Sequence, residues 1–88
     1  MAAIKFTFHG HVQGIGFRAH VKKKAMELSI CGWVKNMPDG AVSAVFSGDP
    51  EMISLLEGYC KRIPSAYVSS VESYTIEDQN FDTFEIIY

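Results

Sequence analysis

The sequence predicts an α+β fold in which two helices cover one face of a mostly antiparallel sheet of four or five strands. Apolar residues alternate with polar ones along residues 4–9, which is the two-residue period of a half-buried strand. Residues 17–28 and 52–63 repeat apolar residues at helical spacing. An Asp-Gly pair at residues 39–40 lies between two strand-like runs, as is typical of a hairpin turn.

The N-terminal strand is expected to end at Gly10, and a loop over residues 10–16 follows it. Glycine favours tight or left-handed backbone, so the glycines of this segment interrupt regular structure. A helix then covers residues 17–28. The buried side chains predicted for this strand and helix are Ile4, Phe6, Phe8, Phe17, Val21, Ala25 and Leu28.

The middle of the chain predicts a hairpin and then a second helix. Its strands cover residues 31–36 and 41–47. Asp49 can cap the next helix, and Pro50 suits a first turn. Pro64 ends that helix, because proline lacks the backbone N–H that a helix interior requires. The predicted buried stripe of the second helix is Met52, Leu55, Leu56, Tyr59, Cys60 and Ile63.

Two strand-like runs remain, over residues 67–77 and 83–88, and the register of the first is left open. The complete order is that of a ferredoxin-like βαββαβ sandwich with one more strand at the C-terminal end. We expect residues 1–88 to form a single domain, because a chain of this size builds one core. This fold hosts many functions, so function must be argued from a site.

Composition narrows the possible partners. The net charge is -2 and the sequence pI is near 5.8, which disfavours nucleic acid as a partner. The sequence contains neither a leader-like segment nor a long apolar run, so we expect no membrane partner and a cytoplasmic protein. We also expect a monomer. Cys31 and Cys60 fit neither a redox pair nor a zinc spacing. We expect free thiols, although their redox state does not follow from sequence.

The segment before the first helix has the features of an anion site. Its glycines allow backbone N–H groups to turn inward, and the helix N-terminus carries partial positive charge. Arg18 adds a permanent charge with forked donors that match two phosphate oxygens. A turn glycine followed by a solvated arginine would give the same spacing, so the residues alone leave both interpretations open.

Asn36 is the second candidate, because its side-chain amide both donates and accepts hydrogen bonds and can hold a water molecule. A turn-capping asparagine is the open alternative. The histidines form no metal-ligand pattern, and no nucleophile has a base beside it. A reaction that uses neither a metal ion nor a protein nucleophile suits an acyl phosphate, whose carboxylate leaving group requires no strong general acid.

Residues 10–18, Gly-His-Val-Gln-Gly-Ile-Gly-Phe-Arg, resemble the first signature of the acylphosphatase family. Residues 32–36, Gly-Trp-Val-Lys-Asn, followed by the Asp-Gly pair at 39–40, resemble the second. The resemblance implies hydrolysis of acyl phosphates to a carboxylate and inorganic phosphate by direct attack of water on phosphorus, with no cofactor and no metal. It implies that Arg18 binds the phosphate and Asn36 orients the water. The loop that it implies around the phosphate is Val12, Gln13, Gly14, Ile15, Gly16, Phe17 and Arg18.

The sequence departs from the family pattern at turns. Ser29 stands where a helix-ending glycine is common, Ser43 where an acidic residue often follows the hairpin, and residues 63–65 replace a frequent Gly-Pro. Two other interpretations remain. One is a noncatalytic anion-sensing module, as occurs within larger carbamoyl-transfer proteins. The other is an RNA-binding ferredoxin-like domain, which the acidic charge and the placement of the aromatic residues disfavour.

Overall fold

Five strands and two helices make up residues 2–88, the part of the chain that the computed structural model describes. Neither helix is long and apolar enough to cross a membrane. The element order confirms the predicted α+β, ferredoxin-like arrangement. In chain order the elements are β1 (Ala2–His11), α1 (Phe17–Glu27), β2 (Cys31–Asn36), β3 (Val42–Gly48), α2 (Pro50–Cys60), β4 (Tyr67–Ile76) and β5 (Phe84–Ile87).

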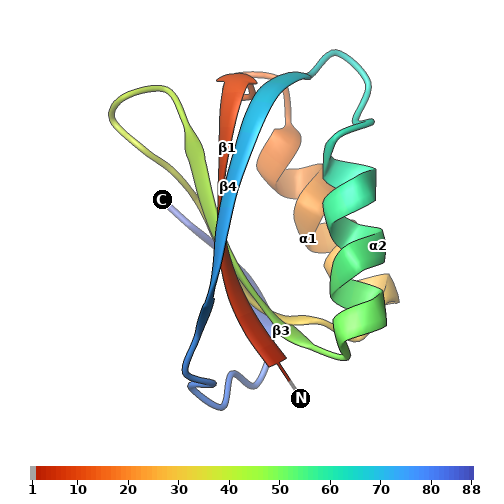
Figure 1. The fold of residues 1–88 in the computed structure, drawn as a ribbon. Helices are drawn as coiled ribbons and strands as arrows, with labels where there is room; N and C mark the ends of the chain where they lie inside the picture. The colour runs from red at the N-terminus through yellow and green to blue at the C-terminus, as the bar shows by residue number, and fades with distance from the viewer. Residues whose placement is uncertain (1) are drawn as a thin grey trace.

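The strands form one sheet in the order β4-β1-β3-β2-β5. The three pairs that involve β1, β2, β3 and β4 are antiparallel, and only the β2–β5 pair is parallel. Both helices pack on the same face of this sheet (Figure 1). The loop before α1 and the β2–β3 hairpin lie at the same end of the molecule, opposite the N-terminus (Figure 1). This common end is where the predicted site residues gather.

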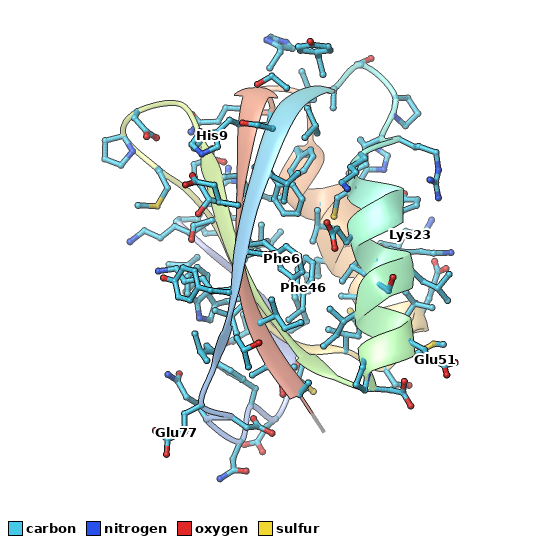
Figure 2. The ribbon with its side chains drawn as sticks, viewed as in Figure 1. Phe6, His9, Lys23, Phe46, Glu51 and Glu77 are labelled. Carbon is cyan, nitrogen blue, oxygen red and sulfur yellow. The ribbon has the colours of Figure 1, made fainter. Side chains whose placement is uncertain are left out.

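Aromatic side chains fill the space between the sheet and the helices. Phe6 and Phe46 point from the sheet toward the helices (Figure 2), with their ring centroids 4.8 Å apart. Phe8 packs on Phe17 with a centroid separation of 5.6 Å, which joins β1 to the first residue of α1. Each of these four side chains is at most 1% exposed. The predicted burial of Phe6 and Phe8 is therefore confirmed, and it anchors the start of α1.

The first strand is longer than predicted. Gly10 and His11 were expected in the loop, but they pair with Val68 and Tyr67 of β4, beyond a β-bulge between His9 and Gly10. Gly10 has φ +127, and a Cβ there would lie 2.1 Å from the carbonyl oxygen of Tyr67. Glycine is thus required by close backbone approach inside a strand, a role that local pattern cannot separate from that of a turn.

The second helix differs from its prediction in its buried stripe and its end. Ile53 is buried, although it was not predicted, whereas Leu55 is 55% exposed. The helix ends at Cys60, three residues before the expected end, because the next turn tightens: the amide of Arg62 donates to the carbonyl of Tyr59 at 2.9 Å. The predicted N-terminal cap is confirmed, since Asp49 accepts a 2.8 Å hydrogen bond from the amide of Glu51.

Two departures from the family pattern fall where the backbone is left-handed. Ser29 follows α1 with φ 57, and Ser65 follows α2 with φ 69. An L-residue in this region is less stable than glycine, because its Cβ approaches the following carbonyl oxygen. Ser29 and Ser65 therefore keep turns of the kind that glycine favours, at a cost in stability.

Candidate active site

The loop between β1 and α1 is fixed at both ends and open in the middle. Val12 and Phe17 are each 1% exposed and anchor the loop in the core. Between them, Gly14 and Gly16 are exposed and have φ values of 78 and 77. Ile15 separates them with negative φ, so the backbone alternates in handedness. Such alternation points successive amides toward one side and forms an anion-binding concavity.

The amides of this loop have no acceptor in the described part of the chain. Within residues 2–88, none of the backbone amides of residues 14–18 donates a hydrogen bond to the protein. Gly16 is the N-cap of α1 and offers no side chain to cap the helix. The unpaired amides and the positive end of the helix dipole therefore lie together, where an anion can accept hydrogen bonds from the amides.

Arg18 lies in the first turn of α1, beside these amides. Its guanidinium carbon lies 4.9 Å from the ring centroid of Tyr88, a cation–π contact. Across residues 2–88 no carboxylate pairs with Arg18. The charge is therefore not compensated within the described protein, and the forked N–H donors are available to a ligand.

A pocket of about 150 Å³ brings the predicted residues together. Arg18 of α1 and Asn36 of β2, which are 18 positions apart in the sequence, both line it. From the predicted loop, Gln13 and Ile15 direct their side chains elsewhere, Gln13 to the β2–β3 hairpin and Ile15 against the core. The loop and helix residues that do line the pocket are Val12, Gly14, Gly16, Phe17, Arg18 and Ala19.

Asn36 is the last residue of β2 and pairs with Val42 across the hairpin. Its side chain is half-buried and makes no hydrogen bond with any atom of residues 2–88. The alternative role considered for Asn36 was to cap the turn. Asp39 caps the turn instead, because its side chain accepts a 3.0 Å hydrogen bond from the amide of Ala41. The Asn36 amide thus remains free to bind a ligand or a water molecule in the pocket.

The C-terminal strand contributes two pocket residues that the sequence did not identify, Ile86 and Tyr88. β5 runs parallel to β2 with Val34 opposite Ile86, so the residues after β5 arrive beside Asn36. The sequence predicted a strand over 83–88 without a partner. An aromatic residue directly after the strand was the available signal, but only the pairing with β2 places it near Arg18.

The two cysteines are free thiols, as predicted. Cys60 is buried, and Cys31 is partly exposed. Burial, with a smaller contribution from the negative charge of Glu57, raises the pKa of the Cys60 thiol from 9.0 to about 12. Neither cysteine lines the pocket. Among the residues described, His, Cys, Asp and Glu side chains form no group of three that could hold a metal ion.

Comparison with known proteins extends the resemblance to acylphosphatases from the two signature segments to the whole chain. The acylphosphatase family model matches residues 4–86. An acylphosphatase from Thermoplasma volcanium is 45% identical over 83 residues, which cover 93% of this chain and 92% of that protein. The crystal structure of acylphosphatase from Bacillus subtilis superposes with a TM-score of 0.96 at 28% identity and covers both chains completely.

A second solved structure, an acylphosphatase from Coxiella burnetii, has a TM-score of 0.93 and 37% identity and covers 98% of this chain and 92% of that one. The match to the family model and the identities above hold over nearly the full length of the relatives. The residues that the family model matches, 4–86, include the loop before α1 and the end of β2, where the pocket lies. The chain therefore belongs to the acylphosphatase family, whose activity is the hydrolysis of acyl phosphates.

Proposed function

We propose that this chain hydrolyses acyl phosphates in the pocket between the loop, Asn36 and Tyr88. The observation that carries the proposal is the meeting of Arg18, Asn36 and loop residues with unpaired amides, Gly14, Gly16 and Phe17, around one small pocket. The reaction requires two components, which are hydrogen-bond donors that bind the phosphate and an amide that holds the water. Arg18 and the loop bind the phosphate, and Asn36 orients the attacking water.

The phosphate is held by the charge of Arg18 and by hydrogen-bond donors that point toward its oxygens. The guanidinium of Arg18 donates to two phosphate oxygens at once, which a lysine ammonium cannot do with the same geometry. The loop amides donate to the remaining oxygens, and they require no reorganisation because Val12 and Phe17 already fix the loop. The same donors stabilise the charge that spreads over the equatorial oxygens in the transition state.

The chemical step is a displacement at phosphorus. The oxygen of the water held by Asn36 forms a bond to phosphorus, and the bond between phosphorus and the acyl oxygen breaks. The carboxylate leaves with the electron pair of that bond, and the protons of the water pass to phosphate and solvent. A carboxylate is weakly basic, so it leaves without a general acid. The step as proposed uses neither a covalent intermediate nor a metal or cofactor.

The proposed partner is a small-molecule acyl phosphate, and neither nucleic acid nor membrane takes part. Arg18, the loop amides and Asn36 supply the groups that the proposed step requires, so the step as proposed needs no second copy of the chain and we propose action as a monomer. Two free cysteines are typical of a reducing compartment, which supports a cytoplasmic location.

The test is release of inorganic phosphate from benzoyl phosphate by the parent chain and two variants. We expect Arg18→Gln to lower kcat/KM by about 10³- to 10⁵-fold, because it removes the charge that binds the phosphate. We expect Asn36→Ala to lower kcat by about 10²-fold while the inhibition constant of inorganic phosphate stays close to that of the parent. Matched controls are Arg62→Gln and Gln79→Ala, at exposed positions outside the pocket.

Three results would contradict the proposal. The parent chain could bind phosphate without turnover, which would favour the noncatalytic module. Arg18→Gln could hydrolyse the substrate as fast as Arg62→Gln does. Asn36→Ala could retain the parent kcat, which would remove the role assigned to its amide.

A further inference from the structure

Gln13 joins the phosphate loop to the hairpin that carries Asn36. Its side-chain nitrogen donates to the carbonyl oxygen of Met37 at 2.8 Å and to that of Ala41 at 2.9 Å. These are the only hydrogen bonds, within the described residues, between a loop side chain and the hairpin. Both donors of one amide are thus used to join the loop before α1 to the turn of the β2–β3 hairpin, 24 and 28 positions further along the chain.

The two acceptors lie at the base of the hairpin turn. The amide of Met37 donates to Ala41 at 2.8 Å, and the amide of Gly40 donates to Met37 at 3.1 Å. Gln13 therefore binds the carbonyls that also close the turn. Asn36 is joined to Met37 by a single planar peptide unit. A displacement of the Met37 carbonyl consequently displaces the backbone that supports the Asn36 side chain.

On the loop side, Gln13 lies between two residues that belong to the pocket. Val12 and Gly14 both line the pocket, whereas Gln13 itself does not. Its side chain is half-buried, so its hydrogen bonds are partly shielded from competing water. The loop holds the phosphate and the hairpin holds Asn36. Gln13 thus joins the segment proposed to hold the phosphate to the segment that carries Asn36.

We propose that Gln13 is a positioning residue that sets the distance between the bound phosphate and the water held by Asn36. The inference rests on the proposed roles of Asn36 and the loop. Gln13 does not line the pocket, so it acts through the backbone of Asn36. A displacement of a water-holding group by a fraction of an ångström to 1 Å lowers the rate by up to about 100-fold.

The test is a double-mutant cycle in kcat with Gln13→Met and Asn36→Ala, because Met matches Gln in length and lacks its donors. We expect Gln13→Met to lower kcat by about 10- to 100-fold and to change the inhibition constant of inorganic phosphate by less than about threefold. In the Asn36→Ala background, the same substitution should change kcat by less than about threefold, since the group it positions is gone. Val68→Ala, in β4 away from the hairpin, is the control for a general loss of packing.

The outcomes separate the inference from the function on which it rests. If Gln13→Met lowers kcat equally in both backgrounds, or leaves the parent kcat unchanged, while Asn36→Ala alone is impaired, only the role of Gln13 is wrong. If Asn36→Ala retains full activity, the proposed role of Asn36 fails and that of Gln13 fails with it. Should Gln13→Met not fold, Gln13→Asn replaces it. The asparagine side chain keeps the amide but is too short to reach both carbonyls. Gln13→Asn should therefore lower kcat in the parent background and leave kcat nearly unchanged in the Asn36→Ala background.

Discussion

Arg18 stands out among the charged residues because its partner is an aromatic ring and not a carboxylate. The nearest described interaction of its guanidinium is the ring of Tyr88, at 4.9 Å from the centroid. The aromatic face orients the guanidinium without occupying its N–H donors or neutralising its charge. An arginine held in this way keeps its full attraction for an incoming phosphate dianion.

Replacing Tyr88 tests this orientation. We expect Tyr88→Leu to weaken inhibition by inorganic phosphate by about two- to fivefold, which corresponds to the loss of an exposed cation–π contact. The measurement is the inhibition constant from initial rates with benzoyl phosphate. Tyr67→Leu, an exposed tyrosine on β4, is the control. Equal effects of the two substitutions would show that the Tyr88 ring does not orient Arg18.

Cys60 gives a pH dependence whose sign follows from its burial. The pKa of the thiol is raised from 9.0 to about 12 in the folded protein, so between these values the native state keeps a proton that the unfolded chain releases. The free energy of unfolding therefore falls as pH rises through this window, by up to about 1.4 kcal/mol for each pH unit. Urea unfolding of the parent and of Cys60→Ala measures it. The difference between the two should shrink above pH 9.0, and a constant difference would contradict the assignment.

The left-handed backbone at Ser29 lowers the free energy of unfolding, and a glycine at this position should restore it. We expect Ser29→Gly to raise the free energy of unfolding by about 1 kcal/mol, because glycine adopts φ 57 without the Cβ clash. Denaturant unfolding followed by the fluorescence of Trp33 measures it. The gain is partly offset by the greater freedom of glycine in the unfolded chain. A loss of stability would mean that the side chain of Ser29 makes a contact that outweighs the strain.

At the scale of elements, β2 matters most, because it joins the hairpin to β5 and ends at Asn36. Gly32 lets β2 approach β3 closely: a Cβ there would lie 1.9 Å from the carbonyl oxygen of Val45. Its φ of +135 adds to the requirement for glycine. The position of Asn36, and with it the pocket, depends on this close contact between backbones.

A pair of glycine substitutions separates close contact from strain. Gly32→Ala should lower the free energy of unfolding by more than about 3 kcal/mol, because its Cβ meets backbone that cannot move away. Gly40→Ala, at φ +96 but with open space around the Cβ, should cost about 1 to 2 kcal/mol. Both values come from denaturant unfolding. Equal costs would show that β2 shifts to accommodate the added methyl group.

Local pattern predicted which elements form better than where they end. The alternation of Phe6 and Phe8 and the Asp49 cap were sufficient for β1 and α2, because both depend on near neighbours in sequence. The bulge at Gly10 and the exposure of Leu55 depend on which backbone or side chain lies opposite. Such tertiary contacts override local propensity, and no single-sequence pattern contains them.

At the scale of the whole molecule, the site also combines parts that local sequence indicates with parts that only tertiary contacts bring together. The loop and Arg18 are continuous in sequence, so glycine spacing and helix polarity made an anion site one of two interpretations there, beside a turn followed by a solvated arginine. The residue type of Asn36 left two interpretations open, and the family resemblance supplied the role that we propose for it. Tyr88 could not be predicted, since it reaches Arg18 only through the parallel pairing of β5 with β2. The sheet thus assembles a pocket from parts that the sequence presents separately.

The most direct test of the central claim is titration of isotope-labelled protein with inorganic phosphate, followed by NMR of backbone amides and arginine side chains. The proposed site predicts saturable shifts that are largest for the amides of residues 14–18 and the guanidinium of Arg18, and that are absent from the Arg18→Gln variant. Three consecutive lysines of α1, residues 22–24, are the alternative place for an anion. Shifts concentrated on these lysines, or no saturation at any phosphate concentration, would contradict phosphate binding by the loop and with it the proposed mechanism of hydrolysis.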